Sequence, residues 1–309
     1  MPKSQEGEAE TSISIVGKII SFFPVSLPAK IYNTLSIVPV FRVILNKIIL
    51  SRIPPKIIIP EGLIVLDQTD VAVSGSLALG VFENAEIDLF RKCLKPNLTI
   101  VDIGANIGYY TVIAGKNVGH GGKVFAYEPE TRNHSFLKNN IEINKLTNVI
   151  PLKIGLSDKK GVSKLYLDKN NKGRHSLAYI AFEKNEEYLI IETDTLDNSL
   201  KQYGSPAIDI IKIDIEGAEF LALDGMEETI KRSPDLILFT EFYPKAITRL
   251  GGDPLIYLEK LIEFGFSLSV IDEDSKQITP ITDVHKFMQN FPKGESFKNI
   301  FAIKTVGHN

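Results

Sequence analysis

Apolar and polar residues follow two different periods along this chain, and their succession predicts its architecture. From Thr99 onward, short apolar runs of β type alternate with stretches that repeat apolar residues at helical spacing. The strands that we expect are 99–103, 123–128, 148–154, 208–214, 235–241, 266–272 and 298–304, and the helices between them are 107–117, 131–144, 217–231 and 254–264. Such alternation predicts an α/β fold with a mostly parallel, seven-stranded sheet and helices on both faces. Because no clear helix separates the last two strands, we expect the sheet to end on an antiparallel strand.

Two segments precede this alternation and a third interrupts it. Residues 62–80 read as a short β-type region, and residues 83–94 have a helical apolar stripe that ends before Pro96. Between Asp158 and Asp197 the pattern changes to short alternating runs around a polar turn, Asn170 to Gly173, which predicts a β-hairpin insertion. Its place in the strand order puts the insertion near the carboxyl edge of the sheet, where open α/β folds bind ligands.

The first 60 residues differ from the rest of the chain. Between Thr11 and Pro60 there is no acidic residue, and the basic ones are Lys18, Lys30, Arg42, Lys47, Arg52 and Lys56. Uncharged runs such as Ile31 to Phe41 are too short to cross a bilayer. We therefore divide the chain into a basic, apolar N-terminal extension (1–60) and a main domain (61–309). The extension forms either short helices packed on the domain, which we favour, or a peripheral contact of residues 11–60 with an anionic membrane.

Composition and charge narrow the function classes. After residue 60 acidic residues outnumber basic ones, which argues against nucleic acid as a partner. The single cysteine, Cys93, excludes an internal disulfide framework and is compatible with a cytoplasmic protein, in contact at most with the inner face of the membrane. The five histidines lack the spacing of a zinc site.

The segment Ile100 to Thr111, IVDIGANIGYYT, carries the strongest chemical signal. It joins an apolar strand that ends near Asp102 to a turn containing Gly104 and Gly108, and then to a helix start. Glycines let a ligand approach the backbone, and free N–H groups at the helix start favour a polar, nucleotide-like ligand. Asp102 disfavours a pyrophosphate at this position and favours a cationic cofactor.

An acid at the end of the next strand refines the identity of the cofactor. Glu128 follows Gly108 by twenty residues, a position from which a carboxylate can accept both ribose hydroxyls of an adenosine. The dinucleotide fingerprint requires a glycine where this chain has Asn106. S-adenosylmethionine, which carries a sulfonium and an amino group, therefore fits the residues better than NAD.

A third acidic group lies in IIKIDIEGAEF, residues 210–220. Asp214 ends the fourth strand, followed by Glu216 and Glu219, and Glu241 ends the fifth strand. Glu219 is equally well explained as a first-turn acid that complements the helix dipole. Asp214, Glu216 and Glu241 are our candidates for a general base, and Asp214 with Glu241 are candidate ligands of a divalent cation. The residues do not decide between these roles. His175, in the insertion, is a further candidate base, although loop histidines are common.

Taken together, these motifs resemble those of the FkbM family of S-adenosylmethionine-dependent methyltransferases. The residues that carry the resemblance are VDIGANIGYYT, YEPE, GLSD (155–158), TDTLD (193–197) and IKIDIEGAE, within a match from about Gly80 to Lys304. The resemblance implies a class I methyltransferase (Rossmann-like) fold with an antiparallel last strand, and O-methyl transfer, often to sugar or polyketide hydroxyls. By position it implies a cofactor site of Asp102, Gly104, Asn106, Gly108, Glu128, Leu156, Ser157 and Asp214.

The resulting prediction is an S-adenosylmethionine-dependent O-methyltransferase whose acceptor is a hydroxyl of a sugar, a glycolipid or a small molecule. Two alternatives stay open. One is a non-catalytic binding module that keeps the cofactor fold, and the other is a Rossmann oxidoreductase.

Overall fold

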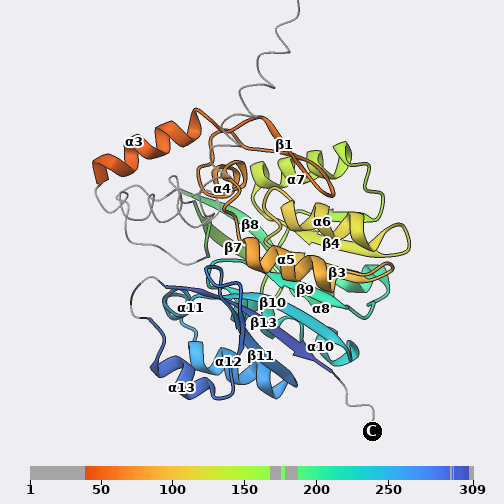
Figure 1. Ribbon diagram of the computed structural model, residues 1–309. Coiled ribbons are helices and arrows are strands. Elements are labelled where there is room, and N and C mark those ends of the chain that lie inside the picture. Colours follow the sequence, from red (N-terminus) through yellow and green to blue (C-terminus); the bar gives the residue numbers. More distant parts are fainter. Residues whose placement is uncertain (1–38, 168–174, 178–186, 293, 295, 306–309) are drawn as a thin grey trace, which may run out of the picture.

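The computed structural model describes residues 39–167, 175–177, 187–292, 294 and 296–305 (Figure 1). Its centre is an eight-stranded sheet with the order β12-β11-β13-β10-β9-β3-β4-β5. In chain order these strands are β3 (Thr99–Ile103), β4 (Lys123–Tyr127), β5 (Val149–Leu152), β9 (Ile210–Ile213), β10 (Leu236–Phe242), β11 (Phe266–Ile271), β12 (Ile278–Pro280) and β13 (Lys298–Lys304). Each predicted strand is present, with ends that differ by two residues or fewer.

The strand directions confirm the expected fold class. Neighbouring strands from β10 through β9, β3 and β4 to β5 are parallel, whereas β13 is antiparallel to both β10 and β11. This order, with an antiparallel last strand inserted beside β10, is that of a class I methyltransferase fold. The short edge strand β12, antiparallel to β11, was not predicted and raises the number of strands from seven to eight.

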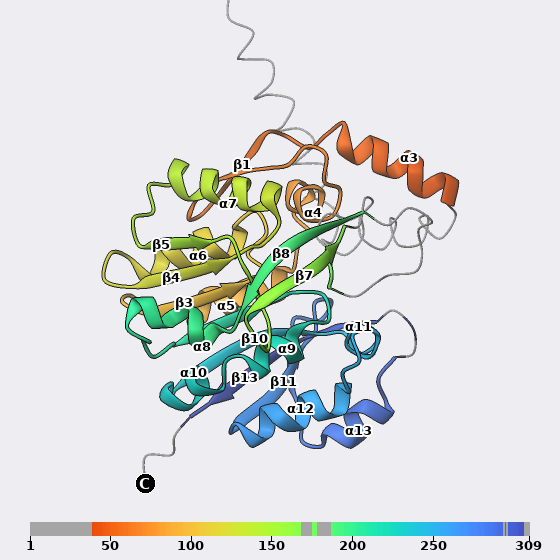
Figure 2. The ribbon, with the colours of Figure 1, turned by 180° about the vertical axis from the view of Figure 1, so that it is seen from behind.

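Helices cover both faces of the sheet, and each face has its own apolar core. The first core packs α5 (Asn84–Cys93), α6 (Tyr109–Val118) and α7 (Thr131–Ile143) on one side. The second packs α8 (Leu196–Ser199), the 3₁₀ helix η1 (Leu200–Tyr203), α9 (Glu219–Asp224), α10 (Glu227–Arg232) and α12 (Pro254–Glu263) on the other. These helices face the viewer in Figure 2. Double-sided burial explains why the central strands read as apolar runs without alternation.

One predicted helix is divided in two. The sequence pattern predicts a helix over 217–231, but the structure has α9 and α10 with a break at Gly225. A Cβ at Gly225 would lie 2.1 Å from the carbonyl oxygen of Ser157, so this position is a close backbone contact. The carboxylate of Asp197 then accepts the N–H groups of Glu228 and Thr229 and so caps α10 from a distant segment.

The prediction of a β-type region over 62–80 is wrong in its second half. Strand β2 (Gly62–Val65) is present, but Val73–Leu79 forms helix α4. The Asp70 carboxylate accepts the N–H groups of Ala72, Val73 and Ser74 at 2.8–3.1 Å, and Gly80 ends the helix in the left-handed conformation. These capping contacts favour the helix over the alternating apolar pattern.

The insertion after β5 is a small sheet of its own, as the hairpin prediction requires. Strands β7 (Gly161–Tyr166) and β8 (Tyr188–Asp194) pair antiparallel, and β6 (Gly155–Leu156) adds to β8 in the order β6-β8-β7. The predicted turn at 170–173 lies outside the described residues. Ser176 pairs with Tyr166 and donates its hydroxyl to the carbonyl oxygen of Glu216, at 2.8 Å. The insertion therefore lies at the carboxyl end of β9, where we expected it.

The described part of the N-terminal segment contains helix α3 (Pro39–Leu50) and strand β1 (Lys56–Ile59). Ile49 and Leu50 at the end of α3 pack against the first core. Strand β1, which replaces part of the predicted short helices, pairs antiparallel with β2, so residue 60 lies in the turn of a hairpin. Residues 1–38 lie outside the described residues, and a membrane contact through residues 11–60 stays a prediction. No helix in the described part of the chain is long and apolar enough to cross a bilayer.

The remaining helices, α11 (Pro244–Arg249) and α13 (Val284–Gln289), follow β10 and β12. Helix α11 lies close to the loop after β9, because a Cβ at Gly217 would lie 2.4 Å from that of Ala246. It thereby helps to fix the segment that carries the acidic residues.

Candidate active site

The glycine loop between β3 and α6 has the backbone that its sequence predicts. Gly104, Asn106 and Gly108 have φ angles of +81°, +50° and +90°, in the region that glycine and asparagine adopt most readily. The N–H groups of Gly104 and Ala105 both donate to the carbonyl oxygen of Tyr127, at 3.0 Å, so the loop is fixed to the end of β4.

Gly104 also meets a second constraint. A Cβ at this position would lie 2.0 Å from the backbone oxygen of Asp214, so the ends of β3 and β9 are in direct contact. The cofactor candidates of the glycine loop and the catalytic candidates after β9 are therefore neighbours. Only a residue without a side chain allows this approach.

Asp102 lies in β3, just before the glycine loop. Its side chain is buried and accepts a short hydrogen bond from the hydroxyl of Thr111, in the first turns of α6. Burial raises the pKa of Asp102 to about 6, while the Thr111 hydroxyl and Lys212 lower it. Asp102 thus connects the strand to the helix that follows the loop.

Glu128 lies directly after β4 and is joined to the loop. Its Oε2 accepts the N–H of Asn106 at 2.9 Å, and its Oε1 accepts the N–H of Glu130 at 2.8 Å. Burial raises the pKa of Glu128 to about 8, and the two backbone N–H groups act in the opposite direction. The structure therefore places the predicted ribose acceptor against the predicted cofactor loop.

Leu156 and Ser157, predicted on the adenine side, lie at the end of β6. Both are buried, Leu156 in the second core, and the N–H of Ser157 donates to the carbonyl oxygen of Asp194 in β8. The backbone of Ser157 also lies against Gly225, at the break between α9 and α10.

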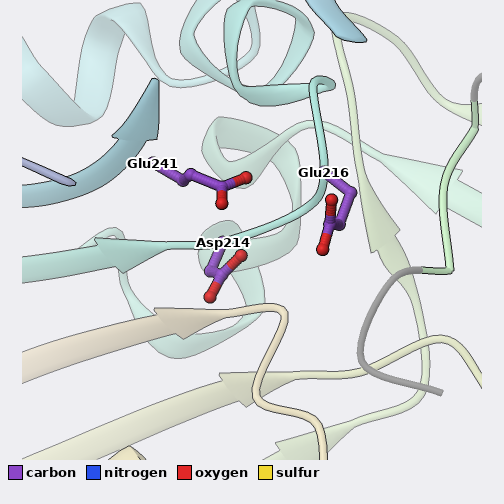
Figure 3. A group of neighbouring side chains, drawn as sticks. All are labelled: Asp214, Glu216 and Glu241. Carbon is purple, nitrogen blue, oxygen red and sulfur yellow. The ribbon is translucent and has the colours of Figure 1, made fainter. Parts of the chain in front are cut away.

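The structure brings together Asp214 and Glu216, which lie at and after the end of the fourth predicted strand, and Glu241, which ends the fifth (Figure 3). One carboxylate oxygen of each lies within 4.8 Å of the others. Asp214 follows β9, Glu216 has a φ of +55° in the next loop, and Glu241 lies in β10. Glu241 is 8% exposed, and within the described part of the chain its buried Oε2 has no hydrogen-bond partner.

Glu219 is the first residue of α9, and its side chain makes a contact that stabilises the start of this helix. Its Oε1 accepts the N–H of Ile215, at 3.0 Å, which fixes the turn before α9. The side chain is fully buried, and burial raises its pKa to about 7. This contact supports the interpretation of Glu219 as a residue of the helix start.

Sequence reasoning missed the only cation that the described residues show within this acidic group. Lys212, in the middle of β9, is buried and lies 3.1 Å from Glu86 and 3.5 Å from Asp214. Its Nζ lies 5.1 Å from the ring centre of Tyr110, whose hydroxyl donates to Glu83 at 2.8 Å. A signal was present, since a lysine within a fully buried strand requires a buried partner of opposite charge.

His175 precedes Ser176, which contacts the acidic segment after β9. It is half-buried in the insertion, and Ser176 next to it donates to the carbonyl oxygen of Glu216. The insertion therefore reaches the loop that carries the acids.

The charges at this edge of the sheet favour a cationic ligand. Lys212 pairs with Glu86 and Asp214. Besides burial, the nearby Glu216, Asp214 and Glu219 raise the pKa of Glu241. Carboxylates in such a site can accept a hydroxyl proton, bind a hard cation, or balance the positive charge of a cofactor. They are poor partners for a phosphate group.

Comparison with known proteins finds matching sequences and folds. The family model described as the Methyltransferase FkbM domain matches residues 102–268. Methyltransferase sdnD of Sordaria araneosa is 29% identical over 165 residues, which are 44% of this chain and 62% of that protein, so the match spans less than two thirds of this relative.

Solved structures with a similar fold include an FkbM methyltransferase from Methylobacillus flagellatus KT (TM-score 0.39, 14% identity, 85% of this chain and 60% of that one). A second is a methyltransferase from Streptococcus mutans in complex with SAH (TM-score 0.41, 11% identity, 72% of this chain and 96% of that one).

Proposed function

The chain belongs to the FkbM methyltransferase family, and from this premise we propose that it is an S-adenosylmethionine-dependent O-methyltransferase. Its acceptor is a hydroxyl of a sugar, a glycolipid or a small molecule. The observation that carries the proposal is the contact between Gly104 and Asp214, because it places a cofactor loop directly beside converging carboxylates.

The residues at the glycine loop fit this cofactor. Glu128 presents a buried carboxylate beside the loop, where it can accept hydrogen bonds from ribose hydroxyls, and Asp102 and Asp214 add negative charge near the loop. This negative charge suits the sulfonium and amino groups of the cofactor. When bound, S-adenosylmethionine supplies an electrophilic methyl group and leaves as S-adenosylhomocysteine.

The acid cluster supplies the chemistry that an acceptor hydroxyl needs. An alcohol is a weak nucleophile until its proton is removed, and a carboxylate oxygen of Asp214, Glu216 or Glu241 can accept that proton. The same oxygens can instead hold a divalent cation that lowers the pKa of the hydroxyl. In either case these side chains also position the acceptor oxygen beside the cofactor loop.

The first test is calorimetry of the full chain with S-adenosylmethionine and, separately, with NAD. We expect S-adenosylmethionine to bind and NAD not to bind. Above pH 8, where the Glu128 carboxylate is ionised, Glu128→Gln should weaken S-adenosylmethionine binding by about tenfold or more, because a neutral amide accepts hydrogen bonds less strongly than a carboxylate. Glu142→Gln, on the exposed side of α7, is the matched control and should bind as the wild type does. Binding of NAD alone would show an oxidoreductase instead.

The second test is a methyl-transfer screen with radiolabelled S-adenosylmethionine against free glycans, lipid-linked sugars and small hydroxylated molecules. Label that is recovered as a methyl ether supports the proposal. Cofactor binding without transfer to any acceptor class would favour the non-catalytic binding module.

A further inference from the structure

We infer that Asp214, Glu216 and Glu241 form a binding site for one hard divalent cation, of the Mg²⁺ or Mn²⁺ type. Binding itself follows from the geometry of this site, and the role of the ion in methyl transfer rests on the proposed function. With the ion taking part in methyl transfer, the activity would depend on the metal.

The first argument is geometric. One oxygen from each of the three side chains lies within 4.8 Å of the other two. Oxygen ligands lie about 2.0–2.6 Å from such ions, so two ligands on opposite sides of one ion are about 4–5 Å apart. The spacing of the three oxygens is therefore close to what ligands of one shared ion require.

The second argument is an unpartnered atom. Glu241 is only 8% exposed, and its Oε2 has no hydrogen-bond partner among the described residues. Figure 3 shows its carboxylate turned toward Asp214 and Glu216. A buried, unpartnered carboxylate oxygen is costly, and a cation between these side chains would satisfy it.

The third argument is charge. Lys212 pairs with Glu86 at 3.1 Å and with Asp214 at 3.5 Å, so its charge is shared with a residue outside the cluster. Among the described residues, Lys212 is therefore shared between the cluster and Glu86, and a divalent ion would add positive charge directly beside the three carboxyl groups.

The position of the cluster agrees with a role in the reaction. Asp214 contacts the glycine loop through Gly104, and Glu216 contacts the insertion through Ser176. An ion held here keeps coordination positions for oxygen atoms of an acceptor. A hydroxyl bound to it would lose its proton to solvent water more readily, because the ion stabilises the alkoxide.

The experiment is a Mn²⁺ titration of the full chain after dialysis against a chelator, with bound metal measured by electron paramagnetic resonance. We expect one Mn²⁺ per chain. Glu216→Gln and Glu241→Gln should each weaken binding by about tenfold or more, because each removes a charged ligand. Glu216 is half-buried, so Glu216→Gln keeps the test valid if Glu241→Gln fails to fold.

Glu128→Gln is the matched control, since it neutralises another buried carboxylate next to the cofactor loop. It should keep Mn²⁺ binding while it loses affinity for S-adenosylmethionine, and Glu216→Gln should show the reverse. This opposite pattern distinguishes failure of the metal proposal from failure of the proposed function. Absence of Mn²⁺ binding at millimolar metal, or binding unchanged in Glu216→Gln, would overturn the metal site.

Discussion

At the scale of single residues, most chemistry-bearing positions have their roles defined by one or two contacts. Gly104 is a glycine because the left-handed turn after β3 and the backbone oxygen of Asp214 both exclude a side chain. Glu128 reaches the same loop through the N–H of Asn106. The site therefore depends on the backbone contact between strand ends as much as on its acids.

The two constraints on Gly104 can be separated by alanine substitution. Gly80→Ala is the matched control, since Gly80 has a φ of +69° but nothing within 4 Å of its added Cβ. Gly80→Ala should lower the free energy of unfolding by about 1–2 kcal/mol, the cost of the left-handed conformation. Gly104→Ala should lose at least about 3 kcal/mol, because the backbone must also move. Urea denaturation measures both, and equal losses would show that the loop tolerates the Cβ.

At the scale of elements, a buried ion pair joins α5 to β9. Lys212 and Glu86 have side chains that are 3% and 1% exposed, and their charged atoms are 3.1 Å apart. The N-terminus of α5 is held in turn by Glu273, which accepts the N–H groups of Ala85 and Glu86. This pairing fixes α5 to the strand whose end carries Asp214.

Removal of one partner should cost more than removal of both. Lys212→Met leaves the Glu86 carboxylate buried without a cation and should lower the free energy of unfolding by about 3–5 kcal/mol. The double variant Glu86→Gln with Lys212→Met should recover a large part of this loss. Lys260→Met, which breaks the exposed pair with Asp224, is the control and should cost about 1 kcal/mol or less. Additive losses in the double-variant cycle would contradict the coupling.

At the scale of the whole molecule, buried acids make stability depend on pH. Burial raises the pKa of Asp102 from 3.8 to about 6 and that of Glu128 from 4.5 to about 8. Above the usual pKa of each group, the folded chain binds more protons than the unfolded chain. The stability from these two groups is thus complete at low pH and is lost as pH rises toward 8.

We therefore expect the melting temperature of the cofactor-free protein to fall between about pH 4 and pH 8. Each group can contribute up to about 1.4 kcal/mol per pH unit within its own range. Glu128→Gln, which cannot ionise, should make the decline shallower. Scanning calorimetry at several pH values measures this, and a melting temperature that rises over this interval would contradict the expectation.

The sequence by itself determined the strands, the glycine loop and the acids at the strand ends, because each depends on local patterns. Apolar runs specify buried strands, glycines specify left-handed turns, and carboxylates at strand ends mark the carboxyl edge of a parallel sheet. For the same reason the sequence misjudged Val73–Leu79 and the helix break at Gly225. There, capping by Asp70 and the close approach of Ser157 decided the outcome.

Only the tertiary structure decided which side chains meet. The pairing of Lys212 with Glu86 joins residues 126 positions apart, and no local period encodes such a contact. The structure likewise brought one oxygen each of Asp214, Glu216 and Glu241 within 4.8 Å, and no described residue provides a hydrogen-bond partner for one buried oxygen of Glu241. Local sequence patterns indicate which residues carry chemistry. The distances between these residues depend on how the sheet and its insertion pack.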